Sequence, residues 1–320
     1  MRSGASGPGE RTKRPPSRSA ASFIRYLIKY KTLYFLSVPG IAYFLVFKYV
    51  PVAGVAIAFQ DYNIFRGFLG SEWVGFEHFE RMFQYMDFLR ILGNTLIIAF
   101  YDLIFAFPAP ILLALLLNEL RHAGYKKFLQ TMIYMPHFLS WVIIGGIALA
   151  ILGLEHGLLN HLLEWIGTER IFFLGDAEHI RKVIIGSGLW RDAGWGTIVY
   201  LAAIAGINPD LYEAAEMDGA GRWRQTLHVT LPSLLPTITI LLLLQFGNFL
   251  DFGFERVYVF LNSLNISKGD ILDTYIYRVG LLDQQLSYTT AIGVFKSIVG
   301  LLLLAVGNAV SRKTTGESLY

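Results

Sequence analysis

The segment NPDLYEAAEMDGAGRWRQTLHVTLP, residues 208–232, is polar, yet it lies between two apolar runs that are each long enough to cross a membrane. Asn208 can cap a helix, and Pro209 fits a first helical turn. Asp210 and Glu213 suit the positive end of such a helix. We therefore expect a short helix that begins near the start of this segment, in a loop between two membrane spans.

Two glycines should end this helix. Gly219 and Gly221 can adopt the left-handed conformation that closes helices. A second short helix should follow, with Trp223 and Leu227 four residues apart on one face. Leu231-Pro232 should then begin the next span, because proline is tolerated in a first turn. The expected result is a rigid knob that fits a groove on a soluble partner; a hairpin that only connects two spans is the alternative.

The composition indicates a membrane protein. Of the 320 residues, 54% are hydrophobic and only 16% are charged, whereas soluble domains carry about 25% charged residues. The chain has no cysteine, which excludes disulfides, thiolate metal sites and cysteine nucleophiles. It also has no G-x-x-x-x-G-K-[ST] phosphate loop, and its histidines are scattered. We therefore expect no catalytic site, no metal site and no cofactor in this chain.

Six apolar runs are long enough for transmembrane helices, because about 20 apolar residues cross the hydrocarbon as a helix. They lie near residues 32–58, 91–117, 129–152, 183–207, 231–252 and 289–310. Lys48 and Pro51 leave the outer end of the first run uncertain. The predicted fold is an all-α membrane protein with six transmembrane helices and a polar loop between spans 4 and 5.

Basic residues near span ends predict the orientation. They gather in the N-terminal segment, after the second span and at the C-terminus: Arg11, Lys13, Arg14, Arg18, Arg25, Lys29 and Lys31; Arg121, Lys126 and Lys127; Arg312 and Lys313. Both termini and the 208–232 loop should therefore be cytoplasmic. We expect a disordered basic tail at 1–22, a membrane domain at 23–312 and a second cytoplasmic tail at 313–320.

The polar loop also carries a motif. Glu213-Ala214-Ala215, then Gly219, Val229 and Leu231-Pro232, resembles the EAA motif of ABC-importer permeases. Val229 stands where the family usually has isoleucine, which is a mild departure. The resemblance extends from about Tyr26 to Val310 and is to the permease subunit of a type I ABC importer of the carbohydrate-uptake class.

This resemblance implies a coupling helix that docks in a cleft of a separate ATPase subunit. Glu213 would pair with a basic residue of the ATPase, Ala214 and Ala215 would pack in its groove, and Gly219 would permit the bend. Asp218 and Arg222 are further candidate coupling residues.

The resemblance also implies the other subunits of the transport complex. Two ATPase subunits would bind ATP and Mg, and a second, homologous permease would complete a heterodimer. An extracytoplasmic binding protein would deliver an oligosaccharide, which the spans would pass by alternating access. The chain would then be a multi-pass protein of the bacterial cytoplasmic (inner) membrane, in contact with lipid and with no nucleic acid.

Two N-terminal stretches bear on the cargo. YKTLYFLSVPGIAYFLVFKYVPVAGVAIAFQDYNIFRG (30–67) and WVGFEHFERMF (73–83) resemble the branch that imports oligosaccharides from degraded polysaccharides. Alginate, pectin-derived and aldouronate importers belong to that branch, and we favour an acidic, alginate-like cargo. Another cargo of the same permease class, an ion-driven secondary transporter and a membrane scaffold without transport activity remain alternatives.

A saccharide pathway needs aromatic faces for ring stacking and polar groups for hydroxyls, and an acidic sugar also needs cations. Polar side chains at membrane depth usually face a bundle interior or an aqueous cavity. The candidate pathway residues are Trp141, Trp190, Arg191, Gln245, Asn248, Asp251 and Phe252. Their aromatics could instead form an interfacial belt, and Asp251 would repel a uronate unless it pairs with a cation.

Overall fold

The computed structural model describes residues 29–314 and Gly316. The tail expected at residues 1–22 lies outside these residues, as does most of the tail expected at 313–320. The chain divides into two compact units, Met1–Val55 and Ala56–Tyr320. The described part of the first unit contains α2 (Lys31–Phe44), the π-helix η1 (Leu45–Tyr49) and the start of the 3-10 helix η2 (Val50–Phe59).

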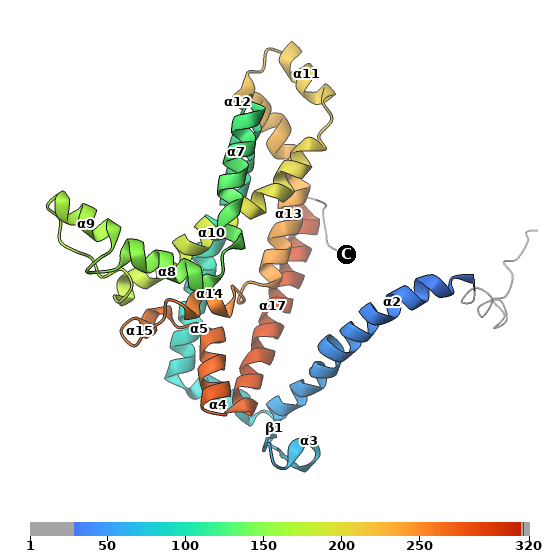
Figure 1. Cartoon of the computed structure of the whole chain (residues 1–320). Helices are drawn as coiled ribbons and strands as arrows, with labels where there is room; N and C mark the ends of the chain where they lie inside the picture. The colour runs from blue at the N-terminus through green and yellow to red at the C-terminus, as the bar shows by residue number, and fades with distance from the viewer. Residues whose placement is uncertain (1–28, 315, 317–320) are drawn as a thin grey trace, which may run out of the picture. The chain divides into compact units, whose positions relative to one another are not determined.

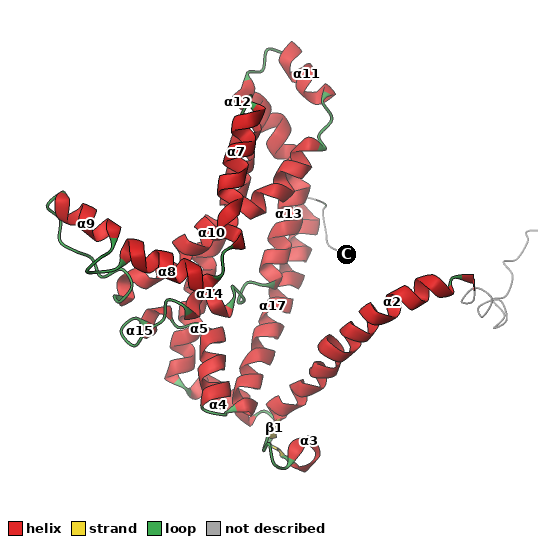
Figure 2. Cartoon of the chain, in the orientation of Figure 1, coloured by secondary structure: helices red, strands yellow, loops and turns green. Residues whose placement is uncertain are grey.

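The second unit is almost entirely helical, as Figures 1 and 2 show. Its single small sheet pairs β1 (Gln60–Asp61) antiparallel to β2 (Glu72–Trp73), with Gln60 opposite Trp73, within the described residues. Its helices are α3 (Gly67–Gly70), α4 (Glu77–Gln84), α5 (Met86–Tyr101), η3 (Asp102–Ala106), α6 (Pro108–Asn118), α7 (Ala123–Tyr134), η4 (Met135–Phe138), α8 (Trp141–Leu152), α9 (Leu158–Trp165), α10 (Ala177–Ala205), α11 (Asp210–Met217), α12 (Arg222–Gln225), η5 (Thr226–Thr230), α13 (Leu231–Gly247), α14 (Phe254–Tyr258), α15 (Ile266–Gly269), α16 (Leu272–Tyr275), η6 (Ile276–Leu282) and α17 (Leu286–Thr314).

Four helices among the described residues are long and apolar enough to cross a membrane: Lys31–Phe59, Met86–Asn118, Arg222–Gly247 and Leu286–Lys313. They correspond to the first, second, fifth and sixth expected spans. The third expected span is broken, because Ala123–Phe138 and Trp141–Leu152 meet at a 106° bend. The fourth corresponds to α10, which has 29 residues but does not qualify by composition. The described residues thus contain four spans by this measure, or five if the bent pair is one span.

The expected start of the fifth span at Leu231-Pro232 coincides with the start of α13, but the helix as a whole is longer than expected. The helix begins at Arg222 and continues without interruption to Gly247. A π turn, η5, precedes the proline, and the Leu231 N–H donates to the Thr226 carbonyl oxygen five residues earlier. The wider turn accommodates a ring that has no N–H and that would crowd the preceding turn of an ordinary α-helix.

The second span also contains a π turn that precedes a proline. The π-helix η3 ends one residue before α6, where Pro108 stands in the first turn. The Phe107 N–H donates to the Asp102 carbonyl oxygen at 3.0 Å, again across five residues. The π turn keeps α5 and α6 in one long helix and places Asp102 at its midpoint, since π turns re-aim the side chains that they contain.

The core is divided into three small clusters of buried side chains. One joins α5, α8, α10 and α14 through Ile98, Ile144, Ile180 and Val257. The second joins α4, α5, α16 and α17 through Met82, Phe88, Leu272 and Ile292. The third joins α6, α10 and α13 through Ala114, Tyr200 and Leu234. Many large apolar side chains outside these clusters are exposed, as expected where lipid or another subunit is the surrounding medium.

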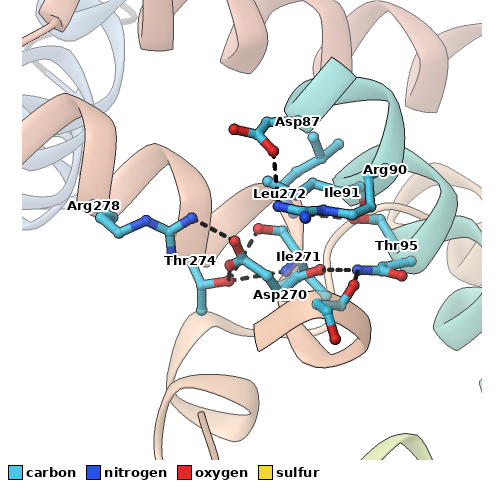
Figure 3. Close-up of polar contacts among 11 residues, drawn as sticks. Asp87, Arg90, Ile91, Thr95, Asp270, Ile271, Leu272, Thr274 and Arg278 are labelled. Carbon is cyan, nitrogen blue, oxygen red and sulfur yellow. Dashed lines mark hydrogen bonds and ion pairs between the residues drawn. The ribbon is translucent and has the colours of Figure 1, made fainter. Parts of the chain in front are cut away.

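A polar network fastens the segment before α16 to α5 (Figure 3). Asp270 is fully buried, and it accepts hydrogen bonds from Thr274 at 2.7 Å and from Arg278 at 2.5 Å. The Leu272 N–H donates to Thr95 Oγ1 on α5 at 3.0 Å. A buried carboxylate is stable only when it is paired and hydrogen-bonded, and these bonds fix the long segment between α13 and α17 beside the spans.

Candidate functional site

A polar cavity of about 440 Å³ lies between η3–α6, α10 and α13, and it extends to α14. Four of the expected pathway residues line it: Gln245, Asn248, Asp251 and Phe252. They lie together because α13 ends at Gly247 and the following turn exposes consecutive residues to the same space. The combination of amide, carboxylate and aromatic groups suits the hydroxyls and ring faces of a sugar.

The other three expected pathway residues do not line this cavity. Trp190 borders a separate apolar groove between α8 and α10. Trp141 is buried in a core cluster, and the Arg191 guanidinium carbon lies 4.8 Å from its ring centroid. Arg191 contacts the cavity only through Asp192, with 3.0 Å between Nη1 and Oδ1.

The charged residues Asp102, Asp192 and Arg256 also line the cavity, although the expected pathway set did not include them. Asp102 and Asp192 are ionisable groups at membrane depth, which was the available signal in the sequence. With Asp251, the lining holds three carboxylates and one guanidinium. The cavity wall of this chain is therefore acidic rather than basic.

Asp102 and Arg256 form a buried ion pair in this wall. The guanidinium contacts both carboxylate oxygens, at 2.6 and 2.8 Å, and the two side chains are 6% and 8% exposed. Arg256 also donates to the Ile184 carbonyl oxygen on α10, at 3.2 Å from Nε and 3.1 Å from Nη2. A Cβ at Gly188 would lie 2.3 Å from this guanidinium. Glycine is therefore required there for α10 to approach the pair.

A second polar cluster lies at the break in the third expected span. His137 Nδ1 and Arg191 Nη1 both contact Asp192 Oδ1, at 2.8 and 3.0 Å. Arg191 Nε donates to the Leu139 carbonyl oxygen at 3.3 Å. After the break, Ser140 caps α8 by accepting the Ile143 N–H at 3.4 Å. These bonds satisfy backbone groups that the bend frees and anchor them to α10, as burial in an apolar medium demands.

A second cavity, of about 390 Å³, adjoins the first, since Asn248 and Asp251 line both. Lys296 of α17 pairs there with Asp273 and lies 3.9 Å from the Asp251 carboxylate, so a cation does accompany Asp251. Asp273 Oδ2 is buried without a hydrogen-bond partner among the described residues. Burial raises the pKa of Asp273, and the hydrogen bond from Lys296 opposes that rise.

The polar loop at residues 208–232 forms the expected bend. α11 ends at Met217, and Gly219 has a φ of +76°. Glu213, Ala214, Asp218 and Gly219 are exposed, and Ala215 is partly exposed. The Glu213 carboxylate has no ion pair or hydrogen bond with the described residues. The exposed loop surface thus presents the free Glu213 carboxylate beside two small side chains.

Contacts to the spans hold this loop in place. The hydroxyls of Tyr212 on α11 and Thr230 on η5 lie 2.9 Å apart. Arg222 lies 3.4 Å from Glu119, just after α6, so this expected coupling residue is engaged within its own chain. Met217 and Trp223 are 88% and 77% exposed. Exposed side chains of this size next to a fixed backbone are typical of a protein-binding surface.

Comparison with known proteins gives a consistent result. Residues 91–316 match the family described as "Binding-protein-dependent transport system inner membrane component". Protein LplB of Bacillus subtilis (strain 168) is 49% identical over 299 residues, covering 93% of this chain and 94% of LplB. The polygalacturonan/rhamnogalacturonan transport system permease protein YteP of the same organism is 51% identical over 294 residues, covering 92% of each chain.

Solved structures give the same result for the fold. A chain of a bacterial ABC transporter involved in the import of the acidic polysaccharide alginate has 40% identity and a TM-score of 0.85, covering 92% of this chain and 99% of that chain. A chain of the bacterial alginate transporter in complex with an alginate pentasaccharide-bound periplasmic protein has 39% identity and a TM-score of 0.85, with the same coverage.

Proposed function

This chain belongs to the family of binding-protein-dependent transport system inner membrane components, and on that premise we propose that it is the permease subunit of an ABC importer for oligosaccharides. The observation that carries the proposal is one continuous helix, Arg222–Gly247. Its cytoplasmic end would carry the EAA loop, and its other end borders the polar cavity through Gln245. Such a helix connects a docking surface to a cargo site.

We propose that the membrane domain, residues 23–312, crosses the membrane six times with both termini in the cytoplasm. The fourth span would lie near residues 183–207, most of them in α10, despite its charged residues. Arg191 is paired with Asp192, and Arg181 donates to Asn94 on α5 at 2.6 Å. Pairing lowers the free-energy cost of charge at membrane depth. The pairs therefore support a span in α10, although its composition does not qualify it.

In the proposed mechanism, separate ATPase subunits bind ATP and Mg and dock on the exposed face of α11. Glu213 would receive a basic residue of the ATPase, Ala214 and Ala215 would pack in its groove, and Asp218 and Gly219 would form the bend. Arg222 is better assigned to holding the loop against Glu119. Movement of the docked loop would drive alternating access.

A second permease subunit is proposed as partner because this chain leaves apolar helices uncovered. Within the second unit, Leu112 and Leu116 on α6 and Leu301 on α17 are 59%, 62% and 64% exposed. The polar cavity is also open on one side in a single chain. A homologous partner would complete the cavity wall, and an extracytoplasmic binding protein would deliver the cargo.

For the cargo, we propose an acidic oligosaccharide, supported by the two alginate transporter structures that this chain resembles. The lining of the cavity favours a different candidate, a neutral oligosaccharide. Each of its three carboxylates already has a cation of this chain beside it: Arg256 at Asp102, Arg191 at Asp192 and Lys296 at Asp251. An acidic cargo therefore requires that the cations come from the partner permease.

The test is gentle co-purification of this chain from its native membrane, followed by mass spectrometry of every retained protein. We expect a phosphate-loop ATPase and a second permease. Recovery of the chain alone, still transporting after reconstitution, would contradict the proposal and favour an ion-driven carrier. Titration of the associated binding protein with uronate and neutral oligosaccharides of equal length then distinguishes the two cargo classes.

A further inference from the structure

An apolar groove of about 340 Å³ lies between α8 and α10, outside the polar cavity. α8 contributes Ile144, Ile147 and Ile151 to it, and α10 contributes Val183 and Trp190. Gly186 forms part of its floor, and a Cβ there would meet no heavy atom within 4 Å. The groove therefore has room above Gly186 for a narrow apolar chain.

One end of this groove carries an unpaired cation. Lys182 lies at the groove and is exposed, and its ammonium makes no hydrogen bond or ion pair with the described residues. Its charged neighbours at the start of α10 are engaged: His179 with Asp176 at 3.0 Å, and Glu178 with Lys268. Lys182 is thus the cation left available for a ligand anion.

The surfaces beside the groove are apolar and rigidly held. On the far face of α8, Val142 and Leu149 are 76% and 63% exposed, and on α9 Trp165 is 85% exposed. Asn160 of α9 is fully buried and bonds the Gly153 carbonyl oxygen and both backbone groups of Ile171, at 2.8 to 3.0 Å. Exposed apolar side chains together with an exposed tryptophan are typical of a lipid interface.

We propose that this groove binds an anionic phospholipid, with one acyl chain over Gly186 and the phosphate at Lys182. An apolar trough that ends at a single free cation matches the two parts of such a lipid. Under the proposed topology, the site faces the outer leaflet. The lipid would fill the space between α10 and the helix that follows the 106° bend, and so would support the wall that contains the Asp102–Arg256 pair. This inference concerns lipid and does not depend on the cargo.

The test uses the complete purified complex and native mass spectrometry with phosphatidylglycerol or phosphatidylethanolamine of identical acyl chains. Gly186→Leu should remove one tightly retained lipid per chain, because leucine occupies the groove. Lys182→Gln should lower the binding preference for phosphatidylglycerol over phosphatidylethanolamine by about fivefold, which is the effect of one lysine near an anionic headgroup. Gly146→Leu is the matched control, since Gly146 is equally open but lies outside the groove, and Lys127→Gln controls for loss of charge.

Equal lipid retention in the Gly186→Leu and Gly146→Leu complexes would overturn the proposal. A photoreactive residue at Ser187, which lines the groove, supplies an independent measurement with Gly186 and Lys182 unchanged. A phospholipid adduct there supports the site. An adduct to a second permease or to the binding protein would overturn it, because a protein would then cover the groove.

Discussion

The buried Asp102–Arg256 pair allows a quantitative test of the cavity wall. Both side chains are less than 10% exposed and share two hydrogen bonds, at 2.6 and 2.8 Å, so only a small part of either group reaches the cavity that they line. Asp102→Asn keeps the shape of the side chain but leaves the guanidinium charge without a counterion. Removing one partner of a buried pair costs about 3–5 kcal/mol, and we expect Asp102→Asn to lower the free energy of unfolding by roughly that amount.

The compensating double variant isolates the charge effect. Arg256→Met alone should also cost about 3 kcal/mol or more, because it leaves the Asp102 carboxylate buried and unpaired. Asp102→Leu combined with Arg256→Met removes both charges, and it should recover most of the stability, since apolar replacement of a buried pair is often neutral or stabilising. The double variant should therefore be more stable than either single variant.

The assay is denaturant unfolding of the purified chain in mixed micelles, with Asp87→Asn as the matched control. Asp87 pairs with Arg90 at 2.8 Å, but the two side chains are 65% and 49% exposed. Exposed pairs contribute about 0–1 kcal/mol. If Asp102→Asn costs no more than Asp87→Asn, or if the double variant is no more stable than the singles, the argument from buried charge is refuted.

Three further predictions concern the loop and the start of α10. Glu213→Ala should reduce sugar-stimulated ATP hydrolysis by the complex while leaving the spans intact; unchanged stimulation would count against a coupling role. Gly219→Ala should destabilise the loop by about 1–2 kcal/mol, because a φ of +76° disfavours a Cβ, whereas Gly221→Ala, with a φ of −68°, should cost little; equal hydrogen exchange in the two variants would contradict this. Lys268 holds the pKa of Glu178 below 4.5, so their pair stabilises the fold above that pH and is lost as the pH falls through the lowered pKa. Glu178→Gln should therefore narrow the difference in Tm between neutral and acidic pH, and an unchanged difference would exclude this contribution.

The sequence predicted the spans whose signal is local. Long apolar runs suffice for the first, second, fifth and sixth spans. The bend at residues 139–140 was not foreseen, because it depends on the contact of His137 with Asp192 and on the bond from Arg191 to the Leu139 carbonyl oxygen, which join residues 55 and 52 apart. The π turn before Pro232 was missed because a proline usually starts a helix when it follows a polar loop.

Only those residues of the candidate site that lie within one segment of the chain could be predicted from the sequence. Gln245, Asn248 and Asp251 follow one another along the chain, so one segment revealed them together. The partner of Asp102 is 154 residues away, and no local pattern links Asp102 to Arg256. The bend at Gly219 was predicted because a single glycine determines it, whereas the contact of Arg222 with Glu119 joins residues 103 apart.

The uninterrupted helix Arg222–Gly247 has a mechanical consequence. Its 26 residues make a rod roughly 39 Å long at 1.5 Å per residue. A lever of this length amplifies rotation: a tilt of about 10° about one end moves the other end by roughly 7 Å. The stiffness of the helix determines how much of a displacement at Trp223 is transmitted to Gln245. The helix bends most easily at the π turn Thr226–Thr230 and at Pro236. These few residues therefore determine how far one end of the helix moves for a given movement of the other end.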